Sequence, residues 1–170
     1  MTTDSEADDS GPAARPIVVR EATRAELQDA LDVQHAAFER VARMFGIPPE
    51  RLSAVTETLD TLTEQSDGGV LFLVAVAETH VVGTVRARVR PDGVVEVGRL
   101  AVDEAVQRRG VGRRLMGEVE LRYPQARRFE LFTGAEAEGP LALYGSLGYL
   151  PFRRQAGESV DIVWLAKERD

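Results

Sequence analysis

The segment from Gln107 to Gly112 has the residue types and spacing that most clearly indicate chemistry. It reads Gln-Arg-Arg-Gly-Val-Gly, follows an apolar run over residues 97–102 and precedes a predicted helix. Gly110 and Gly112 have no Cβ atoms, so a ligand can approach the main chain, and no proline removes an N–H from the loop. Free amides at a helix N-terminus, with the positive end of the helix dipole behind them, favour phosphate. The segment therefore predicts a pyrophosphate site.

Spacing excludes two better known glycine loops. A dinucleotide-binding fingerprint requires a third glycine or alanine where this chain has Leu115, and a P-loop requires Gly-Lys-Ser/Thr, which is absent. The remaining pattern, Gln-x-x-Gly-x-Gly after a strand, resembles motif A of the GNAT superfamily of acetyl-CoA-dependent N-acetyltransferases. For this loop taken alone, an ordinary strand-to-helix turn is the alternative interpretation.

A second segment resembles motif B of the same superfamily. Residues 143–149 read Leu-Tyr-Gly-Ser-Leu-Gly-Tyr, against the family pattern Leu-Tyr-x-x-x-Gly-Phe/Tyr. The gap between the two motifs holds one predicted helix and one predicted strand, as the fold requires. The resemblance extends over residues 16–167 and weakens in the first third of the chain.

The resemblance also implies which residues bind acetyl-CoA. Backbone groups of one strand would bind the pantetheine arm as if it were an added strand, with strand amides also facing the thioester oxygen. Loop residues would surround the pyrophosphate, mostly through their N–H groups. The strand residues are Leu100, Ala101 and Val102, and the loop residues are Gln107, Arg108, Arg109, Gly110, Val111, Gly112 and Arg113.

Tyr144 is the candidate acid. Acetyl transfer to an amine needs a base, donors for a tetrahedral oxyanion, and an acid for the thiolate that leaves. By resemblance Tyr144 lies beside the cofactor sulfur, and an ordinary phenol pKa of about 10 is roughly matched to an alkyl thiolate. The alternative is a tyrosine that only packs on the helix face it shares with Leu141 and Leu147.

Glu96 is the candidate base. It lies in the middle of a predicted strand, where a carboxylate is a poor choice. It also lies fourteen residues before Gly110, where histone-type members of the superfamily carry their glutamate base. It could act directly or through water, and partial burial would raise its pKa toward the working range. The alternative is an exposed strand glutamate, since many family members work without a dedicated base.

One position departs from the family pattern. Many members carry an asparagine seven residues before the tyrosine, and this chain has Ala137 there. Glu136 or Glu138 would have to replace that contact, and neither has the paired donor and acceptor of an amide. The departure affects the cofactor geometry expected near the thioester and leaves the pyrophosphate site unchanged.

Apolar periodicity and turn residues predict the elements that position these residues. Strands are predicted over residues 16–22, 70–77, 81–90, 94–103, 129–133, 149–153 and 160–165. The second and third strands form a hairpin in which Thr84, Arg86, Arg88 and Arg90 alternate with apolar residues, which predicts a half-exposed hairpin. The strand over 129–133 is expected to be buried.

Helices are predicted between these strands. Thr23 and Glu26 predict a capping box for a helix that ends near Gly46. Apolar residues predict a second helix over 52–62, and a third runs from Gly110 to before Pro124. Gly139-Pro140 starts the last helix, with proline in its first position, and Gly148 closes it. These elements predict an α/β (α+β) mixed sheet with helices on both faces. The resemblance implies the GNAT fold, with a mostly antiparallel sheet of six to seven strands.

Composition narrows the function classes. The chain has 170 residues, no cysteine, and two histidines, His35 and His80, too far apart in sequence to predict a metal site. The net charge of −7 argues against nucleic-acid binding and is compatible with a cationic substrate in an acidic cleft. Without an apolar window of membrane-spanning length or a signal sequence, the chain is expected to be cytoplasmic. Residues 1–15 are expected to be a disordered acidic tail, and 16–170 one domain.

We therefore expect an N-acetyltransferase that transfers acetyl from acetyl-CoA to a primary amine by direct attack in a ternary complex. A small-molecule acceptor is expected first, and a peptide or protein N-terminus second. The alternative is a non-catalytic acyl-CoA-binding module or sensor. A homodimer through the C-terminal strands follows from family analogy alone.

Overall fold

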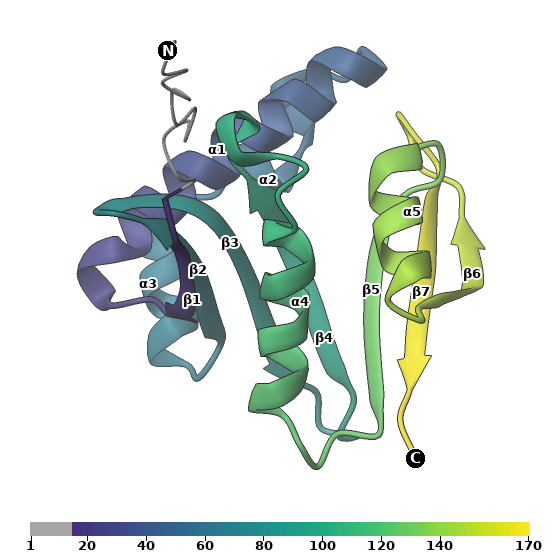
Figure 1. Cartoon of the computed structure of the whole chain (residues 1–170). Coiled ribbons are helices and arrows are strands. Elements are labelled where there is room, and N and C mark those ends of the chain that lie inside the picture. The colour runs from purple at the N-terminus through teal and green to yellow at the C-terminus, as the bar shows by residue number, and fades with distance from the viewer. Residues whose placement is uncertain (1–14) are drawn as a thin grey trace, which may run out of the picture.

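The computed structural model describes residues 15–170, which form a seven-stranded sheet with the order β1-β2-β3-β4-β5-β7-β6 (Figure 1). All neighbouring strands are antiparallel except β4 and β5, which are parallel. The predicted mixed, mostly antiparallel sheet is therefore confirmed. The strands are β1 Ile17–Glu21, β2 Leu71–Ala77, β3 His80–Val89, β4 Val95–Val102, β5 Arg128–Gly134, β6 Leu150–Gln155 and β7 Ile162–Glu168.

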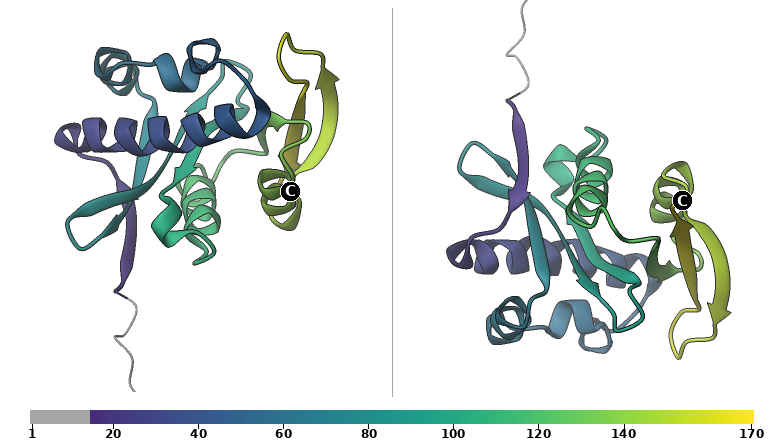
Figure 2. Two further views of the ribbon diagram at one scale, coloured as in Figure 1. Left: turned by 90° about the horizontal axis from the view of Figure 1, so that it is seen from above. Right: turned by 90° about the horizontal axis from the view of Figure 1, so that it is seen from below.

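Helices cover both faces of the sheet, which confirms the predicted layers (Figure 2). The first three helices lie on one face, and α4 and α5 lie on the other. The helices are α1 Leu27–Phe45, α2 Ser53–Thr56, α3 Leu59–Asp67, α4 Val111–Arg122 and α5 Glu138–Ser146. Short 3-10 turns precede α1, α2 and α4, at η1 Arg24–Glu26, η2 Pro49–Arg51 and η3 Glu104–Val106.

The main core lies between the sheet and helix α4. Alternation along β3 and β4 turns Val85, Val95 and Val97 toward α4, which contributes Leu115 and Val119 to the same cluster. These five side chains are between 0% and 6% exposed. Full burial of such a side chain stabilises the fold by about 1.5–3 kcal/mol. The helix that follows the glycine loop is thus held firmly on the sheet.

Helix α1 begins and ends as the sequence predicts. The Glu26 carboxylate accepts a hydrogen bond from the Thr23 N–H at 2.8 Å, and the 3-10 turn η1 leads into the helix. Gly46 ends the helix with a left-handed backbone at φ 63°. Glycine suits this position because it has no Cβ to clash in that conformation.

The prediction of one helix over residues 52–62 is wrong. The segment contains two helices, α2 and α3, with extended backbone between them at Glu57 and Thr58. The Thr58 hydroxyl accepts a hydrogen bond from the Thr61 N–H at 3.3 Å and so caps α3. The Glu57 side chain turns inward to two arginines, as described below, and those distant partners outweigh the local helical periodicity.

The prediction of a half-exposed hairpin is wrong at Thr84 and Arg86, whereas Arg88 is exposed as predicted. Thr84 is 3% exposed and Arg86 is 7% exposed, because α1 packs on this face of β3. The Thr84 hydroxyl donates a hydrogen bond to the Leu73 carbonyl at 3.0 Å, and the Arg86 guanidinium has side-chain acceptors. Burial of these polar side chains is tolerated because both are hydrogen-bonded.

The C-terminal elements differ from the prediction at their ends. Helix α5 starts at Glu138, so Pro140 is its third residue and not its first. Proline is tolerated there as well, because a backbone N–H in the first turn of a helix has no intrahelical acceptor. Gly148, at φ 93°, follows the helix as predicted. Phe132 of β5 is 47% exposed, so this strand is not buried throughout, although Phe129, Glu130 and Leu131 are buried. All residues of the edge strand β6 are exposed.

The predicted acidic tail lies outside the described residues, apart from Arg15. The Arg15 carbonyl accepts a hydrogen bond from Arg109 Nη2 at 3.0 Å, and its side chain forms an ion pair with Glu78 at 2.6 Å. No helix in the described part of the chain is both long and apolar enough to cross a membrane.

Candidate active site

Strands β4 and β5 are paired only near their first residues. The register joins Val95 to Phe129 and Glu96 to Glu130, and the strands then diverge (Figure 1). Past that point, the edge of β4 that turns toward β5 has no strand partner among residues 15–170, so its backbone groups can bind an extended ligand as an added strand does. Leu100, Ala101 and Val102, predicted to hold the pantetheine arm, belong to this stretch of β4.

A β-bulge lies in β4 just beyond the point of divergence. The register with β3 passes from Arg86–Gly98 to Thr84–Ala101, so that two residues of β4, Arg99 and Leu100, lie opposite one residue of β3. Arg99 has a left-handed backbone at φ 56°, which is uncommon for a residue other than glycine. A bulge bends and twists its strand, which accounts for β4 leaving β5 here.

The predicted pyrophosphate loop forms the N-terminus of α4. Arg108 and Gly110 have left-handed backbones at φ 63° and φ 73°, and the helix starts at Val111. The first N–H groups of an α-helix have no intrahelical acceptor and carry the positive end of its dipole. The loop over 107–113 therefore has the geometry that its sequence predicts for an anion.

Gly112 places this loop close to α5. A Cβ atom on Gly112 would lie 3.2 Å from Leu143 Cδ2 and 3.7 Å from Leu100 Cδ2. Arg113 Nη2, predicted to bind the pyrophosphate, donates a hydrogen bond to the Ser146 hydroxyl at 2.6 Å. Helix packing thus favours glycine at this position, in addition to the predicted approach of a ligand. It brings the loop, the unpaired stretch of β4 and the helix of Tyr144 together.

Tyr144 is buried in α5, with 8% of the residue exposed. Its ring packs edge-on against Tyr149, with 6.1 Å between the ring centroids. Burial raises the pKa of Tyr144 to about 12, above the ordinary value used to match it to a thiolate. The phenol is therefore neutral at physiological pH, and its main contribution is a hydrogen bond donated to a developing negative charge, since full proton transfer from so weak an acid is unfavourable.

Glu96 lies where β4 and β5 are still paired. Because its neighbours Val95 and Val97 pack toward α4, its side chain points to the opposite face, the one covered by α1. The carboxylate forms an ion pair with Arg88 at 2.7 Å and a longer one with Arg90 at 3.6 Å, and its side chain is 25% exposed. Glu96 therefore lies on the face opposite the predicted pyrophosphate loop, and its carboxylate is already paired with the Arg88 guanidinium.

Ala137 precedes the first residue of α5. Its N–H donates a hydrogen bond to the Gly134 carbonyl at 3.1 Å, and its own carbonyl accepts from the Leu141 N–H at 3.0 Å. Glu136 has an exposed side chain whose recorded partner, at 3.7 Å, is Arg154. The methyl group of Ala137 cannot supply the polar contact that an asparagine makes.

Glu57, between α2 and α3, is the centre of a charge cluster that the sequence analysis did not find. Its Oε2 accepts hydrogen bonds from Gln34 Nε2 at 2.7 Å and from Arg86 Nη2. Its Oε1 accepts from Arg99 Nε at 3.2 Å and from Nη2 at 2.8 Å. Burial raises the pKa of Glu57, but the hydrogen bonds, that of Arg99 foremost, outweigh it and lower the pKa to about 2. We call these four residues the Glu57 cluster.

No local signal in the sequence identifies this cluster. Glu57 is 42 residues from Arg99 and 29 from Arg86 along the chain. His35, which could not be assigned from sequence, contributes from α1: its Nε2 lies 2.9 Å from the Glu57 carbonyl. Because a carbonyl only accepts, this nitrogen carries the proton. Among residues 15–170 no group of three His, Asp or Glu could hold a metal ion.

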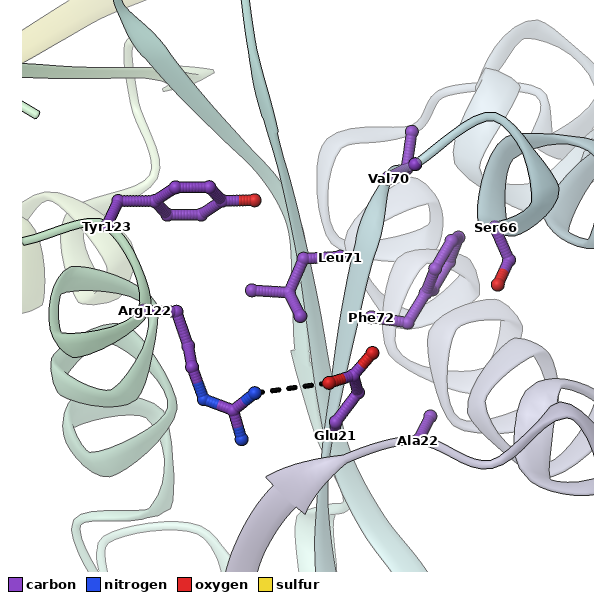
Figure 3. A pocket seen from close by; sticks show the side chains of 9 residues that line it. Glu21, Ala22, Ser66, Val70, Leu71, Phe72, Arg122 and Tyr123 are labelled. Carbon is purple, nitrogen blue, oxygen red and sulfur yellow. Dashed lines mark hydrogen bonds and ion pairs between the residues drawn. The ribbon is translucent and has the colours of Figure 1, made fainter.

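The two described cavities lie elsewhere. The larger, about 320 Å³, lies near the C-terminal end of α4, where Figure 3 shows Glu21 and Arg122 joined by an ion pair of 3.1 Å, with Tyr123 nearby. This is about 18 Å along the helix from the glycine loop. The smaller, about 180 Å³, lies between α1 and the β2–β3 turn, beside Asp29 and His80. Neither contains the residues predicted for acetyl transfer.

The comparison with protein-family models identifies one family. The model of the acetyltransferase (GNAT) family matches residues 34–149. That match includes both motifs of the sequence analysis. No match is found among curated proteins.

Solved structures share the fold at low sequence identity. PaiA N-acetyltransferase from Thermoplasma acidophilum, in complex with coenzyme A, has a TM-score of 0.71 and 18% identity, and the match covers 91% of this chain and 99% of that one. The yncA protein of Salmonella typhimurium, with its cofactor acetyl-CoA, has a TM-score of 0.71 and 16% identity over 91% of this chain and 94% of that one. A ribosomal-protein-alanine N-acetyltransferase from Brucella melitensis has a TM-score of 0.70 and 22% identity over 89% and 99%.

Proposed function

Because the chain belongs to the acetyltransferase (GNAT) family, we propose that it transfers the acetyl group of acetyl-CoA to a primary amine of a small molecule. One observation carries this proposal: the divergence of β4 from β5 opens a strand edge beside the glycine loop and the buried Tyr144. An anion site, a strand edge for an amide-containing arm and a buried phenol together match the three parts of an acyl-CoA thioester.

The residues present fit acetyl-CoA. In this proposal the N–H groups of Gly110, Val111 and Gly112 bind the pyrophosphate, with Gln107, Arg108, Arg109 and Arg113 around them. Backbone groups of Leu100, Ala101 and Val102 bind the pantetheine arm. The two phosphate groups are neutralised by the helix dipole and the surrounding guanidinium groups.

The chemical step is a direct attack of the neutral amine on the thioester carbonyl. A C–N bond forms, and the C–S bond breaks when the tetrahedral intermediate collapses. The amine proton passes to a base, and the sulfur leaves as a thiolate that is protonated by the end of the reaction. Tyr144 donates a hydrogen bond to the sulfur, which lowers the energy of the thiolate as it forms.

Glu96 is the base in this proposal, and its carboxylate forms an ion pair with Arg88. The Arg88 guanidinium lies 2.7 Å from the Glu96 carboxylate, so a water molecule held by Glu96 would relay the proton from the amine. The position of Glu96 on the face of α1 supports this role, because α4 and α5 cover the face of the pyrophosphate loop. The amine would then approach from the face of α1.

A non-catalytic acyl-CoA-binding module is the second candidate. Two observations favour it: Ala137 replaces a polar family residue, and the pKa of Tyr144 is raised to about 12. Both reduce the chemical contribution of α5 and leave the pyrophosphate loop unchanged.

A cytoplasmic location, a domain over residues 16–170 and a homodimer through the exposed edge strand β6 stay predictions. Sedimentation velocity would test the last of these.

Thiol release from acetyl-CoA tests the proposal against a panel of amino acids, polyamines, aminoglycosides and peptides. The wild type should turn over at least one amine, and Tyr144→Phe should lower kcat while calorimetry shows unchanged acetyl-CoA affinity. Binding without turnover across the panel would favour the binding module. Absence of acetyl-CoA binding would refute both candidates.

A further inference from the structure

Positive charge is in excess around the bulge of β4, on the face from which the amine would approach. Three guanidinium groups lie there, those of Arg86, Arg99 and Arg40, and the Glu57 carboxylate pairs with the first two. Arg40, on α1, donates to the Val102 carbonyl at 3.2 Å and has no carboxylate partner among the described residues. The net charge of −7 had suggested an acidic cleft, and here the local charge has the opposite sign.

The single carboxylate of the Glu57 cluster is saturated. Four hydrogen bonds from three side chains reach its two oxygens, and its side chain is 13% exposed. A carboxylate has about four lone-pair sites, so Glu57 has no capacity left for a further donor. A new cation in this region therefore finds no acceptor, whereas a new anion finds donors.

Arg99 has one guanidinium nitrogen that can still donate hydrogen bonds to a ligand. Its Nε and Nη2 bind Glu57, and Nη2 also donates to the Ser53 hydroxyl at 2.8 Å. Its Nη1 has no hydrogen-bond partner among residues 15–170, and its side chain is 21% exposed. Glu57 and Ser53 fix the guanidinium, so an anion that binds to it does not have to order a mobile side chain.

The backbone of Arg99 places it at the reaction centre expected for this fold. The residue forms the left-handed bulge of β4, and it immediately precedes the stretch from Leu100 to Val102 that would bind the pantetheine arm. Its side chain leaves β4 toward α2, on the face of α1. A group held by Arg99 would thus lie beside an amine that attacks from this face.

We propose that Arg99 selects an amine acceptor that also carries a carboxylate, as a free amino acid does. The inference rests on the proposed acetyl transfer and adds the class of acceptor. A charged amine alone is repelled by the excess positive charge, whereas a carboxylate on the same molecule offsets that charge and accepts hydrogen bonds from the guanidinium. Glu57 acts as a positioning residue, because it holds Arg99 in place.

The test compares matched acceptors that differ only in the carboxylate: an amino acid, its C-terminal amide and its decarboxylated amine. The kcat/KM values are measured by thiol release for wild type, Arg99→Met and Arg99→Lys. Arg24→Met is the matched control, since it removes an arginine from an exposed ion pair with Asp67 outside the site. Circular dichroism and Tm identify variants that do not fold.

The wild type should prefer the carboxylate-bearing member by about tenfold or more. Arg99→Met should abolish that preference mainly through KM, Arg99→Lys should restore part of it, and Arg24→Met should keep it. Equal kcat/KM for the acid and its amide in the wild type, or equal losses for both in Arg99→Met, would overturn the inference and leave acetyl transfer intact. Turnover confined to internal peptide amines or polyamines would overturn it as well.

A binding measurement covers the case in which no acceptor in the panel is turned over. Wild type saturated with coenzyme A is titrated with N-acetyl amino acids and with their amides, and Tm is recorded. A larger rise in Tm with the acids, lost in Arg99→Met, supports the inference. No difference between acids and amides overturns it. Failure to bind coenzyme A at all refutes the proposed function, and the inference falls with it.

Discussion

Replacing Glu57 with glutamine should reduce stability at neutral pH and have a much smaller effect in acid. The pKa of this carboxyl group is about 2 in the folded protein, against an ordinary value of 4.5. The difference corresponds to about 3 kcal/mol of stability, at 1.36 kcal/mol per pKa unit. Because the side chain is 13% exposed, screening by solvent reduces this figure little.

The direction of the pH dependence follows from the lowered pKa. A carboxyl group whose pKa falls on folding stabilises the protein above its unfolded pKa, and this contribution is lost as the pH falls through the folded pKa. The contribution of Glu57 is therefore complete above about pH 5, falls to roughly 1.5 kcal/mol at pH 3, and vanishes below about pH 2. Glutamine keeps the shape of the side chain and removes the titration.

Urea denaturation of wild type and Glu57→Gln at pH 7 and pH 3 measures this contribution. The difference in unfolding free energy between the two proteins should be about 3 kcal/mol at pH 7 and about 2 kcal/mol smaller at pH 3. Glu26, whose pKa is also about 2, titrates in both proteins and cancels. Glu64→Gln, at an exposed position of α3, should change neither value. A gap between wild type and Glu57→Gln that is equal at both pH values would refute the argument.

Three further predictions concern the site itself. Gly112→Ala should weaken acetyl-CoA binding in calorimetry and cost about 1 kcal/mol of stability, because the new methyl group would lie 3.2 Å from Leu143. Gly117→Ala is the control on the same helix. A methyl group there would have nothing within 4 Å, so this change should stabilise the protein by about 0.5–1 kcal/mol. Tyr144→Phe should lower kcat about tenfold or more with unchanged acetyl-CoA affinity, and an unchanged kcat would exclude the phenol from the reaction. Glu96→Gln should lower kcat/KM about 10²-fold near pH 7, with partial recovery at high pH where more of the amine is neutral; a rate equal to wild type would rule out Glu96 as the base.

The sequence predicted the fold class and the order of the elements that carry the predicted site residues. Strand β1, the C-terminal glycine of α1 and the start of α4 lie where periodicity and turn residues indicate. The helix start predicted at Gly110 was accurate because the loop conformation depends on residues within a few positions of that glycine. Motif order then fixed the arrangement of α4 and α5 by resemblance.

The predictions that failed concern polar residues with distant partners. Thr84 and Arg86 alternate with apolar residues as an exposed strand face would, yet α1 buries them. The helix predicted over 52–62 breaks because Glu57 reaches inward to partners on β3 and β4. Sequence periodicity records which face of an element is apolar, and it carries no information on what packs against the other face.

By itself, the sequence determined the local parts of this protein: the glycine turn before α4, the tyrosine after it in motif B, and the alternation that builds the sheet. The tertiary structure alone decided the bulge at Arg99, the raised pKa of Tyr144 and the surplus of positive charge around Glu57. The physical reason is distance along the chain. Backbone conformation depends mainly on neighbouring residues, whereas burial and charge pairing depend on groups that only folding brings together, such as Glu57 and Arg99, which are 42 residues apart.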